Sequence, residues 1–194
     1  MKCTLLSLAC LLATIPAHAS YIGETEPNNG CATAQGVDAS FSLEADADIT
    51  NATAWAHVSI RGNGNDDQGQ TRDFYRFNTT GGAVLFDIDY GMDDLDSYLN
   101  LYDAAGTLIG RHDDGGVPDA GTIHGYDSYW SPVLAAGDYV LSVGTYPDAS
   151  LGTGQDYVLH ISVENHSTSV PEPASLALLG LGLAGLGLAR RRKA

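Results

Sequence analysis

The sequence predicts an all-β protein, an antiparallel β-sandwich or jelly roll of about eight or nine strands. Apolar and polar residues alternate with a period of two in most segments between residues 20 and 169. Turn residues rich in Gly, Asn and Asp separate these segments, and a helical period occurs only at the two ends. The region between the ends has the size of one ordinary domain.

The strand pattern recurs in nine short segments. Strands are expected at about 41–47, 54–61, 72–78, 83–90, 97–102, 107–111, 128–134, 137–144 and 155–163. Asp103-Ala104-Ala105-Gly106 joins two of them as a hairpin loop, with glycine placed for a positive φ. A short turn of helix is expected at residues 32–35.

The alternation assigns a face to each side chain. In segment 83–90 it directs Tyr90 inward and leaves Asp87 and Asp89 outward. His57 and His160 also fall on outward faces, so we expect surface histidines there rather than zinc ligands. The remaining inward residues are Val84, Phe86, Ile88, Tyr139, Leu141, Val143, Tyr157, Leu159, Ile161 and Val163.

The first 19 residues have the three parts of a secretory signal peptide. Lys2 provides the charged start, an apolar stretch follows over residues 3–15, and Ala17-His18-Ala19 is an Ala-x-Ala cleavage site. Cleavage after Ala19 leaves Ser20 as the first residue of the exported protein. The alternative is a short buried helix.

The last 25 residues predict a membrane helix followed by a basic stop. Residues 174–189 carry no charge and would form a helix of about 24 Å, short but workable for a hydrocarbon core of about 30 Å. The basic stop consists of Arg190, Arg191, Arg192 and Lys193. Positive charge stays cytoplasmic, so the rest of the chain should lie outside, as the signal peptide also requires.

The same tail resembles a PEP-CTERM sorting signal. Its parts are Pro171-Glu172-Pro173, the apolar helix and the basic stop, together covering residues 170–194. The resemblance implies that a membrane enzyme, an exosortase, recognises Pro-Glu-Pro and removes the tail, in bacteria that export polysaccharide. It therefore implies transient anchoring, followed by release or attachment at the cell surface. A permanent single-span anchor is the alternative.

The domain between the two ends is strongly acidic. The chain has 24 Asp and Glu and nine Lys and Arg. Without residues 1–19 and 170–194, which hold Glu172 and five of the basic residues, 23 acids face four arginines and the net charge is −19. Such a surface repels nucleic acid and anionic lipid, and it favours divalent cations. Only Cys31 remains in this region, so an internal disulfide is excluded.

Three stretches of the domain resemble the bacterial pre-peptidase C-terminal (PPC) domain over residues 22–164. The first is Glu24-Thr25-Glu26-Pro27-Asn28-Asn29, and the second is Asp73-Phe74-Tyr75-Arg76-Phe77. The third runs from Leu99 to Val143. It contains Leu99-Asn100-Leu101-Tyr102-Asp103, Asp113-Asp114-Gly115-Gly116 and Ala136-Gly137-Asp138-Tyr139. The resemblance implies a β-sandwich module of exported proteins that has no catalysis of its own.

The PPC resemblance also implies a calcium site. Its candidate ligands are Glu24, Glu26, Asn28 and Asp73. Related sequences often have an aspartate three residues before the strand Asp, where this chain has Gln70, so Asp66 or Asp67 would have to substitute. The alternative is that residues 24–29 are a polar turn. A second, weaker candidate cation site consists of Asp96, Asp113, Asp114 and Asp127, for which a solvated loop is the alternative.

Motifs of common enzymes are absent from the sequence. It contains neither Gly-x-Ser-x-Gly nor His-Glu-x-x-His, so we expect no enzyme. Trp55, Tyr129 and Trp130 are candidates for stacking on sugar rings, and core packing is their alternative role. The sequence thus predicts an exported, calcium-stabilised, non-catalytic β-sandwich with a structural or adhesive role at the cell surface or in the polysaccharide matrix. A carbohydrate-binding module for exopolysaccharide is the alternative function.

Overall fold

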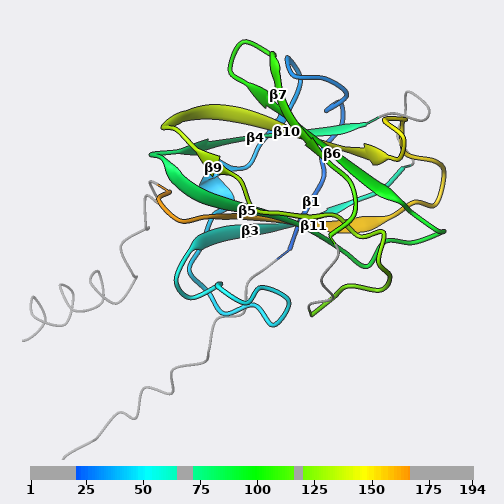
Figure 1. The fold of residues 1–194 in the computed structure, drawn as a ribbon, viewed down its shortest axis with the longest axis horizontal. Helices are drawn as coiled ribbons and strands as arrows, with labels where there is room; N and C mark the ends of the chain where they lie inside the picture. Colours follow the sequence, from blue (N-terminus) through cyan, green and yellow to red (C-terminus); the bar gives the residue numbers. More distant parts are fainter. Residues whose placement is uncertain (1–20, 65–71, 116–119, 167–194) are drawn as a thin grey trace, which may run out of the picture.

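Two facing β-sheets form the body of the protein in a computed structural model that describes residues 21–64, 72–115 and 120–166 (Figure 1). The all-β sandwich prediction is therefore confirmed. The predicted signal peptide, membrane helix and basic stop lie outside the described residues. In those three ranges, no helix has the length and apolar character needed to cross a membrane.

Eleven strands and one short 3-10 helix occur within the described residues. They are β1 (Ile22–Gly23), β2 (Gln35–Gly36), η1 (Asp38–Ser40), β3 (Ala56–Gly62), β4 (Asp73–Thr79), β5 (Gly82–Asp89), β6 (Ser97–Asp103), β7 (Leu108–His112), β8 (Tyr129–Trp130), β9 (Val133–Leu134), β10 (Gly137–Thr145) and β11 (Tyr157–Val163). The single strand expected at 128–134 is divided into β8 and β9, which both pair with β5, because Pro132 between them has no N–H to donate to a ladder. Turn residues replace the helical turn expected at 32–35, and β2 begins at Gln35.

The sheets have the strand orders β1-β3-β11-β5-β8, with β9 also on β5, and β2-β4-β10-β6-β7. All the longer strands pair antiparallel, as expected. In contrast, β1 lies parallel to β3 and β2 lies parallel to β4, so both sheets are mixed rather than purely antiparallel. A hairpin imposes antiparallel pairing, but no hairpin joins β1 to its partner β3 or β2 to its partner β4.

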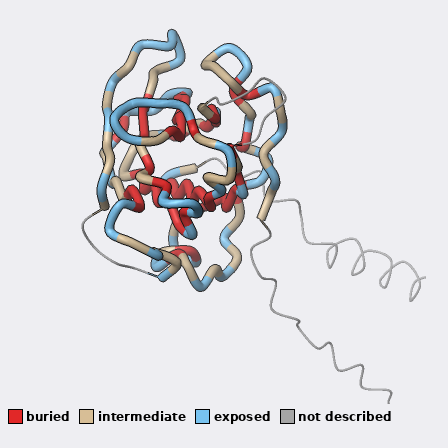
Figure 2. Tube along the Cα trace, turned by 90° about the vertical axis from the view of Figure 1, so that its right-hand side faces the viewer, coloured by how far each residue is buried: buried red, intermediate tan, exposed pale blue. Residues whose placement is uncertain are grey.

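Apolar side chains from both sheets fill the space between the layers. The buried residues are red along the chain trace in Figure 2. Phe77 of β4 and Phe86 of β5 meet edge to face across it, with ring centroids 5.6 Å apart. The predicted inward residues of β5, β10 and β11 are buried there. Tyr90 is an exception: directly after β5 it adopts a φ of 53° and its side chain is 40% exposed, so its predicted inward orientation is wrong.

The outer face of the sheet that contains β3, β11 and β5 is covered by the irregular segment 41–55, seen below this sheet in Figure 1. The strand expected at 41–47 is therefore wrong: its residues form no named strand, although Ser42 makes an isolated bridge to His57. Asp46 disrupts strand pairing here because its carboxylate accepts the N–H of Asp48 and the hydroxyl of Ser59.

A buried polar layer results from this cover. His57 and His160, expected at the surface, are each 1% exposed. Both do point away from the central core, as the alternation predicts, but the sequence pattern did not reveal the segment that covers them. The buried outward residues of β3, β5 and β11 are His57, Ser59, Asp87, Asp89, His160 and Ser162.

The hairpin between β6 and β7 confirms the predicted loop. Gly106 has a φ of 78°, which a glycine adopts without strain. The carboxylate of Asp103 accepts the backbone N–H groups of Ala105 and Thr107 at 2.9 and 2.8 Å, and this closes the turn.

Replacing the fully buried Leu159 by alanine should lower the free energy of unfolding by about 2–5 kcal/mol, because it leaves a cavity between the sheets. Denaturant unfolding of the purified protein measures this change. Leu43→Ala is the matched control, since Leu43 is 52% exposed, and it should change the free energy by no more than about 0.5 kcal/mol. Equal losses in the two variants would contradict the assigned core.

Candidate metal centre

The four residues predicted to bind calcium come together where the N-terminal segment passes from one sheet to the other. β1 lies on one sheet and β2 on the other, and Glu24, Glu26 and Asn28 lie on the segment between them. Asp73 is the first residue of β4. Ligand oxygens of Glu24, Glu26 and Asp73 lie within 4.8 Å of one another. We name this group, together with Asn28, the crossover cluster.

Backbone hydrogen bonds fix the crossover cluster to both sheets. The N–H of Glu24 donates to the carbonyl of Arg61 in β3 at 3.0 Å. The N–H of Phe74 in β4 donates to the carbonyl of Asn28 at 2.9 Å. Asn28 also donates its own N–H to the carboxylate of Glu26 at 3.0 Å. The backbone positions of the candidate ligands are therefore fixed by hydrogen bonds to the two sheets.

Several polar atoms of the crossover cluster are buried without a hydrogen-bond partner among the described residues. They are one carboxylate oxygen of Glu24, one of Glu26, and both side-chain amide atoms of Asn28. Asn28 is fully buried. Unpaired buried polar groups are unfavourable by about 1–3 kcal/mol each, so a ligand that bonds these atoms would stabilise the arrangement.

Burial, with the negative charge of neighbouring carboxylates, raises carboxyl pKa values in the crossover cluster. Burial, followed by the charge of Glu24, raises the pKa of Asp73 to about 9. Burial also raises the pKa of Glu24. Among the described residues, these carboxylates form no ion pair with a basic side chain. A bound cation would supply the missing opposite charge.

Neighbouring side chains orient two of the candidate ligands. The hydroxyl of Tyr157 donates to Asp73 and accepts a hydrogen bond from the hydroxyl of Tyr75 at 2.7 Å. The side-chain amide of Asn63 donates to Glu24. Tyr157 and Asn63 were not among the predicted site residues, and only the strand pairing of β3 with β11 brings them here. Asp66, Asp67 and Gln70 lie outside the described residues.

The weaker candidate set does not converge in the same way. The charges of Asp114 and Asp113 contribute, after burial, to a raised pKa of Asp96, so these three carboxyl groups are neighbours. Asp127 is engaged elsewhere: its carboxylate accepts the N–H groups of Ile123 and His124. Ligand atoms converge in two groups within the described part of the chain, the crossover cluster and a group of Asp48, Asp89 and His160.

The sequence pattern does not reveal this second group. It places Asp89 and His160 on outward strand faces, but Asp48 lies just after the strand expected at 41–47 and has no assigned position. The cross-strand order of β5 and β11 would have placed Asp89 and His160 on one face of one sheet, so pairing information was the missing signal.

The three aromatic residues proposed for sugar stacking are half-buried. The ring of Trp130 packs against Phe86 in the core at 5.6 Å and stacks on His112 at 5.7 Å. A side chain at Gly110 would collide with it. Trp130 therefore packs in the core, and Trp55 and Tyr129 are not exposed platforms. The exposed aromatic residues of the described ranges are Tyr90, Tyr126 and Tyr146.

Without calcium, the contribution of Asp73 to stability should fall as pH rises from about 4 to about 9. The unfolded carboxyl ionises near pH 3.9 and the folded carboxyl near pH 9, so the folded state binds the extra proton in between. The free energy of unfolding, measured in EGTA between about pH 5 and pH 8, should therefore fall less steeply in Asp73→Asn than in the wild type.

Asp138→Asn is the control for this pH experiment, because Asp138 is an exposed acid on β10. It should keep the wild-type slope. Identical slopes for the wild type and Asp73→Asn would contradict the raised pKa of Asp73.

Comparisons with known proteins identify the tail of the chain. The family model described as the PEP-CTERM protein-sorting motif matches residues 169–193, which confirms the sorting signal predicted over residues 170–194. This motif indicates a protein that is exported and processed at the membrane by an exosortase-type enzyme. No curated protein is similar enough to this chain to count as a match.

Among solved structures, the chain is similar to the pre-peptidase C-terminal domain of the collagenase from Bacillus anthracis, known from a 1.0 Å crystal structure. The two share 14% sequence identity with a TM-score of 0.37, over 55% of this chain and 87% of that domain.

Proposed function

We propose that this chain is an exported, non-catalytic β-sandwich protein stabilised by calcium at Glu24, Glu26, Asn28 and Asp73. The observation that carries the proposal is the convergence of three carboxylates beside a fully buried asparagine. One oxygen of Glu24, one of Glu26 and the side-chain oxygen of Asn28 have no hydrogen-bond partner among the described residues. Calcium prefers hard oxygen ligands and takes about six to eight of them, with bidentate carboxylates and water included. A softer metal would favour nitrogen or sulfur, and the cluster offers neither a histidine nor a cysteine.

Calcium at the crossover cluster would connect the two sheets. Its ligands come from the segment between β1 and β2 and from the start of β4. β1 and β2 are only two residues long, so their own hydrogen bonds hold this segment weakly. The ion would therefore stabilise the segment far more than it stabilises the long antiparallel strands.

Export directed by the C-terminal sorting signal is consistent with a calcium site. Outside the cell calcium is available at about millimolar concentration, the range in which extracellular modules bind it. We propose that the protein reaches the cell surface or the extracellular polysaccharide matrix, anchored by its C-terminal helix until processing, and that its role there is structural or adhesive. The proposed signal peptide and membrane helix provide the route.

Calcium titration of the full chain, purified in mild detergent, tests the proposal. We expect one calcium ion per chain, much weaker binding of magnesium, and a loss of at least about tenfold in affinity for Glu26→Gln, since a charged ligand is removed. At 100 times the dissociation constant, calcium should add about 2.7 kcal/mol of stability, a shift of several degrees in the unfolding midpoint.

Glu44→Gln is the matched control, because Glu44 lies in the segment 41–55, outside the crossover cluster. It should bind calcium like the wild type. The calcium proposal fails if the wild type shows no calcium-dependent shift, or if Glu26→Gln keeps the full shift.

A second candidate function, carbohydrate binding, is favoured by a groove beside the crossover cluster. The groove has a volume of about 560 Å³. Tyr21, Tyr90, Arg61 and Asn63 are among its lining residues, so it combines aromatic faces with hydrogen-bond donors. Because Asn63 also bonds Glu24, calcium would order one wall of the groove.

If the groove binds exopolysaccharide, Tyr90→Ala should reduce retention of the protein on polysaccharide from its host at least about tenfold, through loss of a stacking surface. A pull-down assay measures retention. Tyr126→Ala is the control, since Tyr126 is 56% exposed and outside the groove. Absence of wild-type retention, or equal retention of the two variants, would contradict this function.

A further inference from the structure

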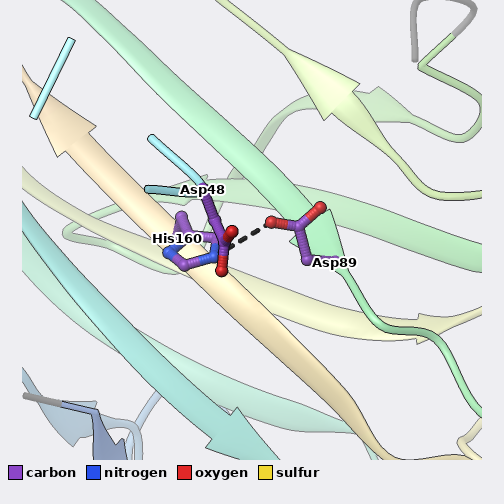
Figure 3. A group of neighbouring side chains, drawn as sticks. All are labelled: Asp48, Asp89 and His160. Carbon is purple, nitrogen blue, oxygen red and sulfur yellow. Dashed lines mark ion pairs between the residues drawn. The ribbon is translucent and has the colours of Figure 1, made fainter. Parts of the chain in front are cut away.

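A second group of potential metal ligands lies under the segment that covers the outer face of the sheet. Asp89 is the last residue of β5, His160 lies in β11, and Asp48 comes from the covering segment 41–55 (Figure 3). One ligand atom from each lies within 4.8 Å of the other two. The side chain of His160 is 1% exposed and that of Asp89 is fully buried. We name this group the outer-face cluster.

A chain of hydrogen bonds fixes which nitrogen of His160 carries the proton. The hydroxyl of Ser59 donates its single hydrogen to the carboxylate of Asp46 at 3.0 Å. The oxygen of Ser59 can then only accept from Nδ1 of His160, 2.8 Å away. In the neutral imidazole, the lone pair is therefore on Nε2, which faces Asp89.

The Nε2 atom of His160 lacks a hydrogen bond among the described residues, although Oδ2 of Asp89 lies only 3.1 Å away. A nitrogen that donated to this oxygen would point its N–H along the line between the two atoms. Two ligands of one metal instead direct their lone pairs at a third point beside that line. In a tetrahedral zinc site with bonds of about 2.0 Å, such ligand atoms lie about 3.3 Å apart, close to the observed distance.

We propose that Asp48, Asp89 and His160 bind a divalent transition-metal ion, with zinc as the best match. One imidazole nitrogen and two carboxylate oxygens suit zinc, whereas the all-oxygen crossover cluster suits calcium. Two carboxylates neutralise the charge of the ion. A three-ligand zinc site leaves a fourth position for water, and Asp48 is the one ligand of the three that is not fully buried.

Residues around the outer-face cluster orient its ligands in the way metal sites require. The Ser59–Asp46 pair holds Nδ1 of His160, the arrangement that usually fixes a metal-binding histidine. The phenol groups of Tyr21 and Tyr90 each donate to Asp48 at 3.1 Å. A bound ion would thus fasten the covering segment 41–55 to β5 and β11, and its role would be structural.

Zinc binding to the untagged full chain, measured by titration and by metal content after dialysis, tests the proposal. We expect one zinc ion per chain, a rise in the unfolding midpoint with zinc, and loss of both in His160→Gln and Asp48→Asn. Ser59→Ala should keep the stoichiometry and weaken zinc binding about 10–100-fold, since it removes only the group that orients His160.

Two matched controls separate this site from others. His124→Gln removes a histidine that also neighbours a carboxylate, Asp127 at 3.7 Å, and should bind zinc like the wild type. Glu26→Gln should weaken calcium binding at least about tenfold and keep zinc binding, so the two sites are tested independently. The thermal unfolding midpoints of His160→Gln and Asp48→Asn, measured without metal, show whether each variant is folded.

The proposal is overturned if the wild type takes up no zinc, or if His160→Gln and Asp48→Asn bind it unchanged. If both variants unfold, Ser59→Ala decides: an affinity equal to that of the wild type overturns the assignment, and an affinity lowered at unchanged stoichiometry supports it.

Discussion

The concentration of buried negative charge at the crossover cluster is the constraint on which the N-terminal part of the fold depends. Glu24, Glu26 and Asp73 must lie together because the chain passes there from one sheet to the other. Burial and the charge of Glu24 both disfavour an ionised Asp73, and its raised pKa expresses that conflict. In the proposal made above, a calcium ion relieves the conflict by supplying the opposite charge.

A second layer of polar side chains distinguishes this sandwich from a simple two-sheet core. His57, Asp89 and His160 are buried on the outer face of one sheet, where an alternating strand pattern predicts exposure. The segment 41–55 lies over this face, and Gly121 packs against the carboxyl group of Asp89. Buried ionisable groups need partners. Ser59 provides one for His160, and its own hydroxyl donates to Asp46. The acidic composition of the domain thus has two structural uses besides solubility, one at the crossover and one under the covering segment.

Much of the fold could be predicted from the sequence because strand alternation is a local property. The inward set of β11, from Tyr157 to Val163, and the hairpin at Gly106 follow from spacing alone. The crossover cluster followed from a family resemblance, not from periodicity. Asp48 could not be paired with His160 in advance, since only the packing of an irregular segment on a distant sheet brings them together. The parallel pairing of β1 with β3, and of β2 with β4, is likewise set by long-range contacts.

The most direct test of the calcium assignment is the number of protons released when calcium binds. Calorimetric titration of the full chain at about pH 7, in two buffers with different heats of ionisation, gives that number. Since the pKa of Asp73 is about 9 without the ion, binding should release about one proton per calcium, and Asp73→Asn should abolish the release. Calcium binding without proton release, or the same release from Asp73→Asn, would contradict the account.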